Sequence, residues 1–497
     1  MGRTPDVLDD PTPIDGPGVD VMVRVAWLLR MSRSAGLRGG PVSVTEMARL
    51  LREQGVSAAP PSVSGWETGR VAPSTAVVEG YERALGLEPG ALRGAVDMLR
   101  RTFGVRPSTA AAPDLGAVDR AAEPVLDDRP VSGAQWLHFC DAALAVRPGL
   151  PTRLMRPLVD RLVSETSRSV FTAYLTRYEG LALLRCGQYA DLVLAALRDH
   201  IEEPGNQVVA EGMSLVAELP DRSSLEVLTG YLGSDDAGWL SAAVLALENA
   251  HLTGGLTAAH WRLVVAPFVR AYDRGADDED RWSALSALWH LLPRELRSEV
   301  EPQLRRPVGP SPAEDPRRDR HAEQELSRDL ADRVCAARGL ARQPLLARLF
   351  HEAMFDRRRA RSLASAHVLM ASPLRGDIGE QVAATTDELP PALRRATAEL
   401  LIALGDHRAA AHARRWVESE DPALLGPGLV ALAHVGERVA QPRLADLLER
   451  RGPVSRRALY HAGMTGHPET ARLAADAAHP LSTGARWWLR HGPAVTS

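Results

Sequence analysis

This chain of 497 residues contains no lysine, so all 59 of its lysine-plus-arginine total are arginine. A phosphate-binding loop of the Gly-x4-Gly-Lys form is therefore excluded. Cysteine is nearly as scarce: Cys140, Cys186 and Cys335 lie far apart and form neither a Cys-x-x-Cys pair nor a disulfide framework. Three isolated cysteines are typical of a reducing compartment, so we expect a cytoplasmic location.

Signals for membranes, catalysis and metals are also missing. No apolar run reaches the roughly 18 residues of a membrane-spanning helix, and the Pro/Asp-rich first 20 residues do not form a signal peptide. His351-Glu352 begins like a zinc-protease helix, but Phe355 stands where the second histidine belongs. The sequence therefore predicts no membrane partner, no catalytic residue, no metal site and no cofactor.

What remains is helix-favouring sequence, too long for one ordinary core. The pattern predicts a disordered tail (1–20), a five-helix domain (21–103), a linker (104–130), helical repeats (131–306), a loop or boundary (307–328) and further repeats (329–497). Between residues 21 and 103 there are 11 Arg against 7 Asp and Glu, a net charge of +4. Since the whole chain carries −4, the rest carries −8. A basic module on an acidic body is expected of a local DNA-binding domain.

Helix signals recur through residues 21–103. Asp20 is a good N-cap for a helix from 21 to 35, and Ser43 with Glu46 has the capping-box form. Pro60 and Pro61 suit the first turn of a third helix. Two more helices are expected over 74–85 and 91–101. The period of apolar residues places one face of each helix inward.

The most informative stretch is Ser62-Val63-Ser64-Gly65-Trp66-Glu67-Thr68-Gly69-Arg70. Val63 and Trp66, three residues apart, are expected to pack inward. Their neighbours on the outer face are small and polar, which a DNA groove can approach. Gly69 sits where a helix ends in a left-handed residue.

With the following Pro73-Ser74-Thr75 and Ala84-Leu85-Gly86-Leu87, this stretch resembles the lambda-repressor/Cro (XRE) type of helix-turn-helix domain over residues 21–103. The resemblance implies that the third helix lies in the major groove. It implies base contacts from the outer face of that helix: Ser62, Ser64 and Gly65, with Pro61 at its start. It implies phosphate or sugar contacts from Thr45, Ser57, Thr68 and Arg70. Glu67 would be structural, paired with Arg30 or Arg33.

The sequence departs from that family pattern in three places. The loop over 36–41 and the turn over 52–61 are longer than usual. Pro60 and Pro61 replace the Gln or Asn that reads adenine in a bidentate way. We therefore expect backbone contacts and DNA shape to carry more of the recognition. The alternative is a helical subdomain that has lost DNA binding and mediates protein contacts.

The long C-terminal part is rich in Ala and Leu and repeats itself. Helix ends followed by glycine recur at Gly405, Gly436 and Gly466, spaced by 31 and 30 residues. Helix pairs with this period resemble HEAT-like repeats; a tetratricopeptide array is the nearest rival, but its signature is not evident. Such an α-solenoid offers a long concave face to a protein, peptide or ligand.

The sequence thus predicts an all-α protein, a helix-turn-helix domain followed by an α-solenoid. The leading functional hypothesis is a transcriptional regulator that binds double-stranded DNA as a homodimer and senses a small-molecule or protein effector. The alternatives are an interaction scaffold tethered to DNA, and a HEAT-like DNA glycosylase using Trp416 or Trp487. Basic residues that are all arginine are typical of GC-rich coding, as in actinobacteria.

Overall fold

The computed structural model describes residues 7–16, 18–35, 40–105, 115–126, 130–275, 277–309 and 319–495. These residues form 27 α-helices and one 3-10 turn, with no β-strand among them, which confirms the all-α class. Within the same ranges, none of the helices combines the length and apolar character needed to cross a bilayer.

Residues 21–103, which we call the head, contain five helices: α1 (Val21–Ser34), α2 (Val44–Glu53), α3 (Pro60–Trp66), α4 (Thr75–Leu85) and α5 (Ala91–Thr102). Their starts follow the capping signals in the sequence. Asp20 accepts the Val23 N–H at 3.0 Å, and Ser43 Oγ accepts the Glu46 N–H at 3.1 Å. The Glu46 side chain pairs with Arg49.

The remaining helices form the body. Its first half contains α6 (Leu115–Leu126), α7 (Gly133–Ala145), α8 (Thr152–Ser167), α9 (Phe171–Arg185), α10 (Ala190–Ile201), α11 (Val209–Ala217), α12 (Arg222–Tyr231), α13 (Ala237–Leu252), α14 (Ala258–Arg274), α15 (Glu279–Trp289), α16 (Arg294–Val300) and η1 (Glu301–Gln303). Its second half contains α17 (Arg320–Ala337), α18 (Pro344–Phe355), α19 (Arg359–Ala371), α20 (Arg375–Thr386), α21 (Pro391–Leu404), α22 (Ala410–Glu418), α23 (Pro422–His434), α24 (Gln441–Glu449), α25 (Pro453–Met464), α26 (Glu469–Ala475) and α27 (Ser482–His491).

Near the C-terminus the helices come in pairs with a regular period. The longer helices α21, α23 and α25 end at Leu404, His434 and Met464, and each is followed by a shorter helix, α22, α24 or α26. α23 packs against both α21 and α25, so the long helices form one row. The chain turns with positive φ at Gly436 (73°) and Gly466 (59°), where only glycine is unstrained.

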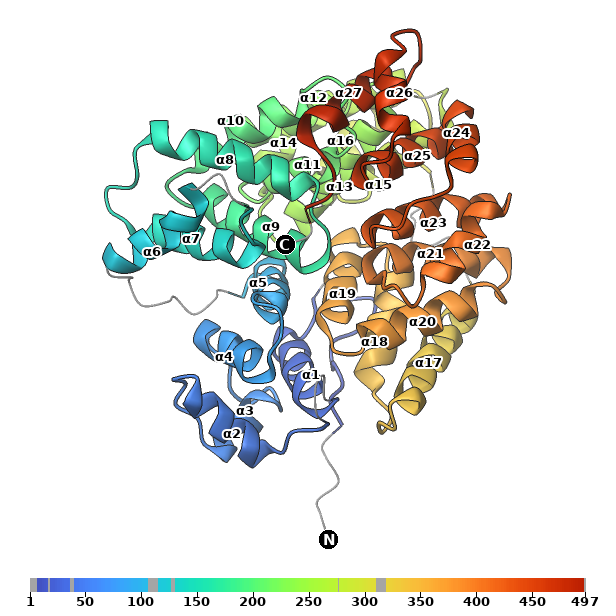
Figure 1. Cartoon of the computed structure of the whole chain (residues 1–497). Helices are drawn as coiled ribbons and strands as arrows, with labels where there is room; N and C mark the ends of the chain where they lie inside the picture. Colours follow the sequence, from blue (N-terminus) through green and yellow to red (C-terminus); the bar gives the residue numbers. More distant parts are fainter. Residues whose placement is uncertain are drawn as a thin grey trace.

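The last helix packs against the middle of the first half of the body, whereas the sequence predicted an α-solenoid with a long concave face. On α27, Trp487 Nε1 donates to Glu203 at 3.1 Å and Trp488 Nε1 donates to Gln207 at 2.7 Å. His491 bonds Glu203 through Nε2 at 2.7 Å and Ser164 Oγ through Nδ1 at 2.9 Å. Both indoles are buried, so the last helix closes the array onto its first half (Figure 1).

The head packs against the body through two of its helices. α5 packs on α9 and α19, and α1 packs on α19, whereas α2 and α3 lie at the outer end of the head (Figure 1). The expected disordered tail is partly wrong, because Leu8 and Asp10 are buried. Asp10 Oδ2 accepts from the buried Arg24 at 2.8 Å, and this ion pair fixes the tail to α1.

Two other expected connections differ from the sequence interpretation. The segment taken as a linker contains α6, which packs on α7 because its buried Val125 supplies an apolar contact. Its flanks, 106–114 and 127–129, lie outside the described residues. Of the loop expected at 307–328, residues 310–318 also lie outside them, and α17 already begins at Arg320.

Candidate nucleic-acid interface

The stretch from Ser62 to Arg70 forms the second half of α3 and the turn after it. Its inner side chains anchor it to the head core: Val63 is fully buried and Trp66 is 8% exposed. Gly69 turns the chain with φ of 72° and approaches the backbone of Met22 on α1. The stretch is therefore part of the folded core on one side and free on the other.

The buried carboxylate of Glu67 connects this turn to two other helices of the head. Glu67 accepts from Arg33 on α1 at 2.7 Å and from the Tyr81 hydroxyl on α4 at 2.9 Å. Of the two partners expected from the resemblance, Arg33 is the one in contact. Burial disfavours the charge on Arg33, but Glu67 outweighs it and raises the arginine pKa. Charge-assisted bonds to two other helices hold the turn rigidly.

The outer face carries most of the expected DNA contacts. Thr45, Ser57, Pro61 and Arg70 are exposed, and the side chains of three others are partly accessible, namely Ser62, Ser64 and Thr68. These residues come from the first turn of α2, the turn before α3, α3 itself and the turn after it. The structure therefore brings them to one end of the head.

Gly65 is the exception, and its expected base contact is wrong. It is buried, and a Cβ placed on it would lie 3.3 Å from a methyl of Val71. The backbone N–H groups of Arg70 and Val71 both bond to the Gly65 carbonyl, which folds the turn back over it. Val71 itself is 52% exposed. This apolar side chain, which the sequence interpretation missed, lies where it could meet a thymine methyl.

The arginines on this face differ in their partners. Arg49 is paired with Glu46 and Glu53, so its charge is largely neutralised. Arg70 instead donates to the Thr68 hydroxyl at 2.9 Å and to Ser64 Oγ at 3.3 Å, with no carboxylate partner among the described residues. These weak hydroxyl contacts orient the guanidinium and leave its charge available to a phosphate.

Arg52, also missed by the sequence interpretation, is exposed and donates to the Ala58 carbonyl at 2.8 Å. The only signal for it was its place just before the turn into α3. Together with Arg70 it gives the face two cations whose described contacts are to neutral oxygens.

The side chains invoked for a glycosylase are not free to hold a base. Trp416 and Trp487 are buried, and their indole N–H groups donate to Asp387 at 2.6 Å and to Glu203 at 3.1 Å. Both tryptophans therefore pack and brace helices.

Three arginines of the second half of the body are also engaged within the chain. Arg348, Arg358 and Arg361 bond to the tail and to carboxylates of α18 and the turn after it.

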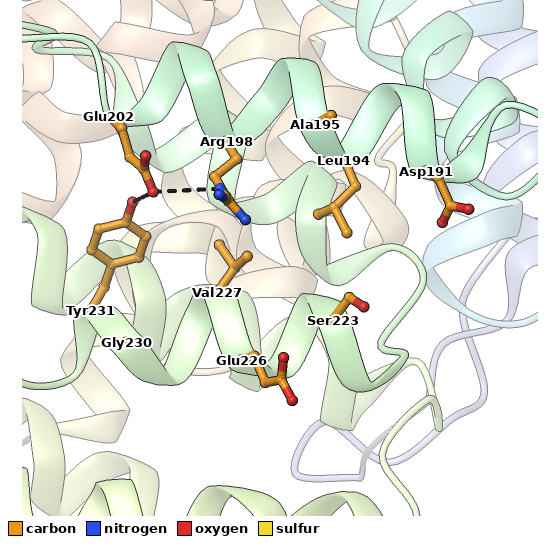
Figure 2. Close-up of a pocket in the computed structure, with 10 residues that line it drawn as sticks. All are labelled: Asp191, Leu194, Ala195, Arg198, Glu202, Ser223, Glu226, Val227, Gly230 and Tyr231. Atoms are coloured by element: carbon orange, nitrogen blue, oxygen red, sulfur yellow. Dashed lines mark hydrogen bonds and ion pairs between the residues drawn. The ribbon is translucent and has the colours of Figure 1, made fainter.

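An open groove of about 630 Å³ lies elsewhere, between α10 and α12 (Figure 2). Glu202, the C-cap of α10, lies 3.7 Å from Arg198 on the same helix and accepts from the Tyr231 hydroxyl of α12 at 3.5 Å. Glu226, at the edge of the groove, pairs with Arg222. Most of the charged side chains that line the groove are therefore paired with neighbouring side chains.

The described residues contain no group of three or more His, Cys, Asp or Glu side chains placed to hold a metal ion. No family model and no curated protein sequence matched the chain when it was compared with them. The functional argument therefore depends on the residues and their geometry.

Proposed function

We propose that the protein is a sequence-specific DNA-binding transcriptional regulator, in which the head binds DNA and the body senses a ligand or partner. One observation supports this most: Arg70 projects beside Ser64 and Thr68 from a turn that Glu67 braces from within. A rigid, exposed helix end with an uncompensated cation suits entry into a groove. The head's net charge of +4 favours the same partner.

In this proposal α3 enters the major groove and α2 crosses the backbone. Ser62 and Ser64 face base edges, while Thr45, Ser57, Arg52 and Arg70 contact phosphate or sugar. Hydroxyls and Val71 read bases with little discrimination, so DNA shape supplies part of the specificity. One head covers a half-site, and we expect a dimer on half-sites about 34 Å apart.

The test is sequencing of genomic fragments bound by the purified full-length protein, followed by titration of the recovered site. Arg70→Ala should weaken binding and reduce the slope of log K against log salt by about 1. Ser64→Glu should abolish binding, because it places a carboxylate in the groove between the negatively charged backbones. Arg222→Ala, an exposed arginine of the body, is the control and should change neither. Binding without a motif, or equal binding by all variants, would overturn the proposal.

A further inference from the structure

A second open pocket, with a volume of about 390 Å³, lies in the first half of the body where α12, α13 and α14 meet. We call it the α12–α14 pocket. Its size is within the range of sites that hold small organic ligands. Two aromatic rings and two arginines line it, and none of the described residues that line it is acidic. This is unusual in a body whose net charge is −8.

The aromatic rings belong to Tyr231, the last residue of α12, and Trp239, in the first turn of α13. They meet edge to face, with ring centroids 4.9 Å apart. Both side chains are partly exposed, so neither ring is enclosed in the core. The Tyr231 hydroxyl donates to Glu202 at 3.5 Å, on the side of the α10–α12 groove (Figure 2). The two rings therefore offer the α12–α14 pocket an apolar surface on which a planar group can pack.

The arginines, Arg270 and Arg274, lie one turn apart on α14 and are both exposed. Arg274 donates to the Gly233 carbonyl at 3.2 Å. Neither arginine has a carboxylate partner among the described residues. Elsewhere in the body such an arginine pairs with an acid one turn away, as Arg222 does with Glu226. Like charges at this spacing on a helix repel each other, and a bound anion would remove that repulsion.

Acids that are close to these residues in the sequence are engaged elsewhere. Their partners are Arg281 for Asp235 at 3.5 Å, Arg456 for Asp236 at 3.4 Å, and the Arg305 backbone N–H for Asp273 at 3.1 Å. Asp236 also accepts two N–H groups at the start of α13. The positive charge of the pocket is therefore left uncompensated by its own surroundings.

A third cation contacts the loop that lines the pocket. The Arg281 side chain of α15 is only 8% exposed, and its Nη1 donates to the Ser234 carbonyl at 2.6 Å. Its Nε and Nη2 are buried without a hydrogen-bond partner among the described residues. Its carboxylate neighbour Asp235 is 99% exposed, where solvent screens its charge. Arg281 therefore adds to the positive potential beneath Ser234.

We propose that the α12–α14 pocket binds a small aromatic anion, a carboxylate or phosphate carried on a planar ring. Arg270 and Arg274 would hold the anion, because the guanidinium fork matches both kinds of oxyanion in a bidentate way. The ring would pack against Tyr231 and Trp239. The assignment of this ligand as the effector rests on the proposed function, whereas binding itself does not.

The test is isothermal titration calorimetry of the full chain with 2-naphthoate and 2-naphthyl phosphate, which share a ring and differ in the anion. We expect saturable binding, and the tighter probe identifies the anion as carboxylate or phosphate. The neutral 2-naphthamide should not bind. Arg270→Gln should weaken binding about tenfold, the loss expected for one charge-assisted bond.

Arg262→Gln is the matched control, since Arg262 is an exposed arginine of the same helix that does not line the pocket. It should bind both probes as the parent does. Absence of saturable binding of both anions, binding of 2-naphthamide as tight as theirs, or equal affinity in Arg270→Gln and Arg262→Gln overturns the proposal.

A second measurement needs no ligand. Because Arg270 repels Arg274 in the free chain, Arg270→Gln should keep or raise the thermal midpoint. A lowered midpoint would show that Arg270 has a structural partner and would contradict the inference. The DNA-binding variant Arg70→Ala should bind the probes normally. Loss of DNA binding with retained probe binding therefore refutes the proposed function alone, and the reverse pattern refutes only the anion site.

Discussion

Replacement of Glu352 by glutamine should loosen the attachment of the head to the body. The Glu352 carboxylate is fully buried and lies 2.7 Å from Arg24 of α1, 2.6 Å from Arg361 and 2.9 Å from Arg348. The amide of glutamine would remove the charge and turn an N–H₂ donor toward arginines that can only donate. Loss of one partner from a buried ion network costs about 3–5 kcal/mol. Local opening of α1 and α18 should therefore become roughly 10²- to 5 × 10³-fold more frequent.

Hydrogen exchange followed by mass spectrometry on peptides from α1, α18 and α19 measures this opening directly. Glu46→Gln is the control, since its pair with Arg49 has the same chemistry but side chains that are 45% and 49% exposed. An exposed pair contributes about 0–1 kcal/mol, so exchange in that variant should change little. Equal protection of α1 in the Glu352→Gln and Glu46→Gln variants would refute the buried network as the attachment.

The Glu352 carboxylate should also make the stability of the protein depend on pH. Burial opposes the ionisation of Glu352, but Arg24 and Arg361 outweigh it and hold its pKa well below the ordinary value. A group whose pKa is lower in the folded chain stabilises it above the unfolded pKa, about 4.3 for Glu, and this contribution is lost as the pH falls further. The difference between the parent and Glu352→Gln should be full at pH 7 and should shrink below about pH 4.

Two further outcomes are expected. Gly463→Ala should lower the thermal midpoint, because its Cβ would lie 2.0 Å from the buried Trp488 ring and overpacking costs about 1–3 kcal/mol. Gly230→Ala, with open space around its Cβ, should keep or raise the midpoint, and similar shifts in both would contradict the packing argument. Stability should also fall as the pH drops from 6.5 to 4, since burial lowers the pKa of His434 to about 4 and the unfolded chain takes up its proton first. His434→Gln should flatten this dependence in pH-series denaturation, whereas replacement of His138, 57% exposed, should not.

The elements that the sequence predicted well are those set by local signals. The caps Asp20 and Ser43 and the paired prolines marked the helix starts of the head, because a cap acts within one turn. The period of glycine-ended helices placed the row α21, α23 and α25 for the same reason. The pairing of Glu67 with Arg33 could be predicted only from the family resemblance, because the two residues are 34 positions apart in the chain.

The features that the sequence did not reveal depend on contacts between distant segments. Asp10 lies in a Pro/Asp-rich stretch that is typical of a disordered tail, and its cations come from Arg24 of α1, 14 residues later, and from Arg348 of α18. The partner of Arg24 on α18 is 328 residues away. A small residue such as Gly65 suits a surface that approaches DNA, but in the structure its small size allows Val71 to pack closely over it. Composition cannot distinguish these two uses of glycine.

Arg101 of α5 is one of the residues that connect the head to the body. It leaves the head and pairs with Glu179 of α9 and Glu218, the residue after α11. Its guanidinium carbon also lies 5.4 Å from the Tyr178 ring centre. An effector that contacts α9 or α11 in the body therefore contacts a segment that holds this arginine. A ligand shifts an equilibrium only through its different affinity for the two states. If such an effector repositions α11 relative to α9, Arg101 transfers that difference to α5, and by linkage DNA changes the affinity for the effector by the same factor.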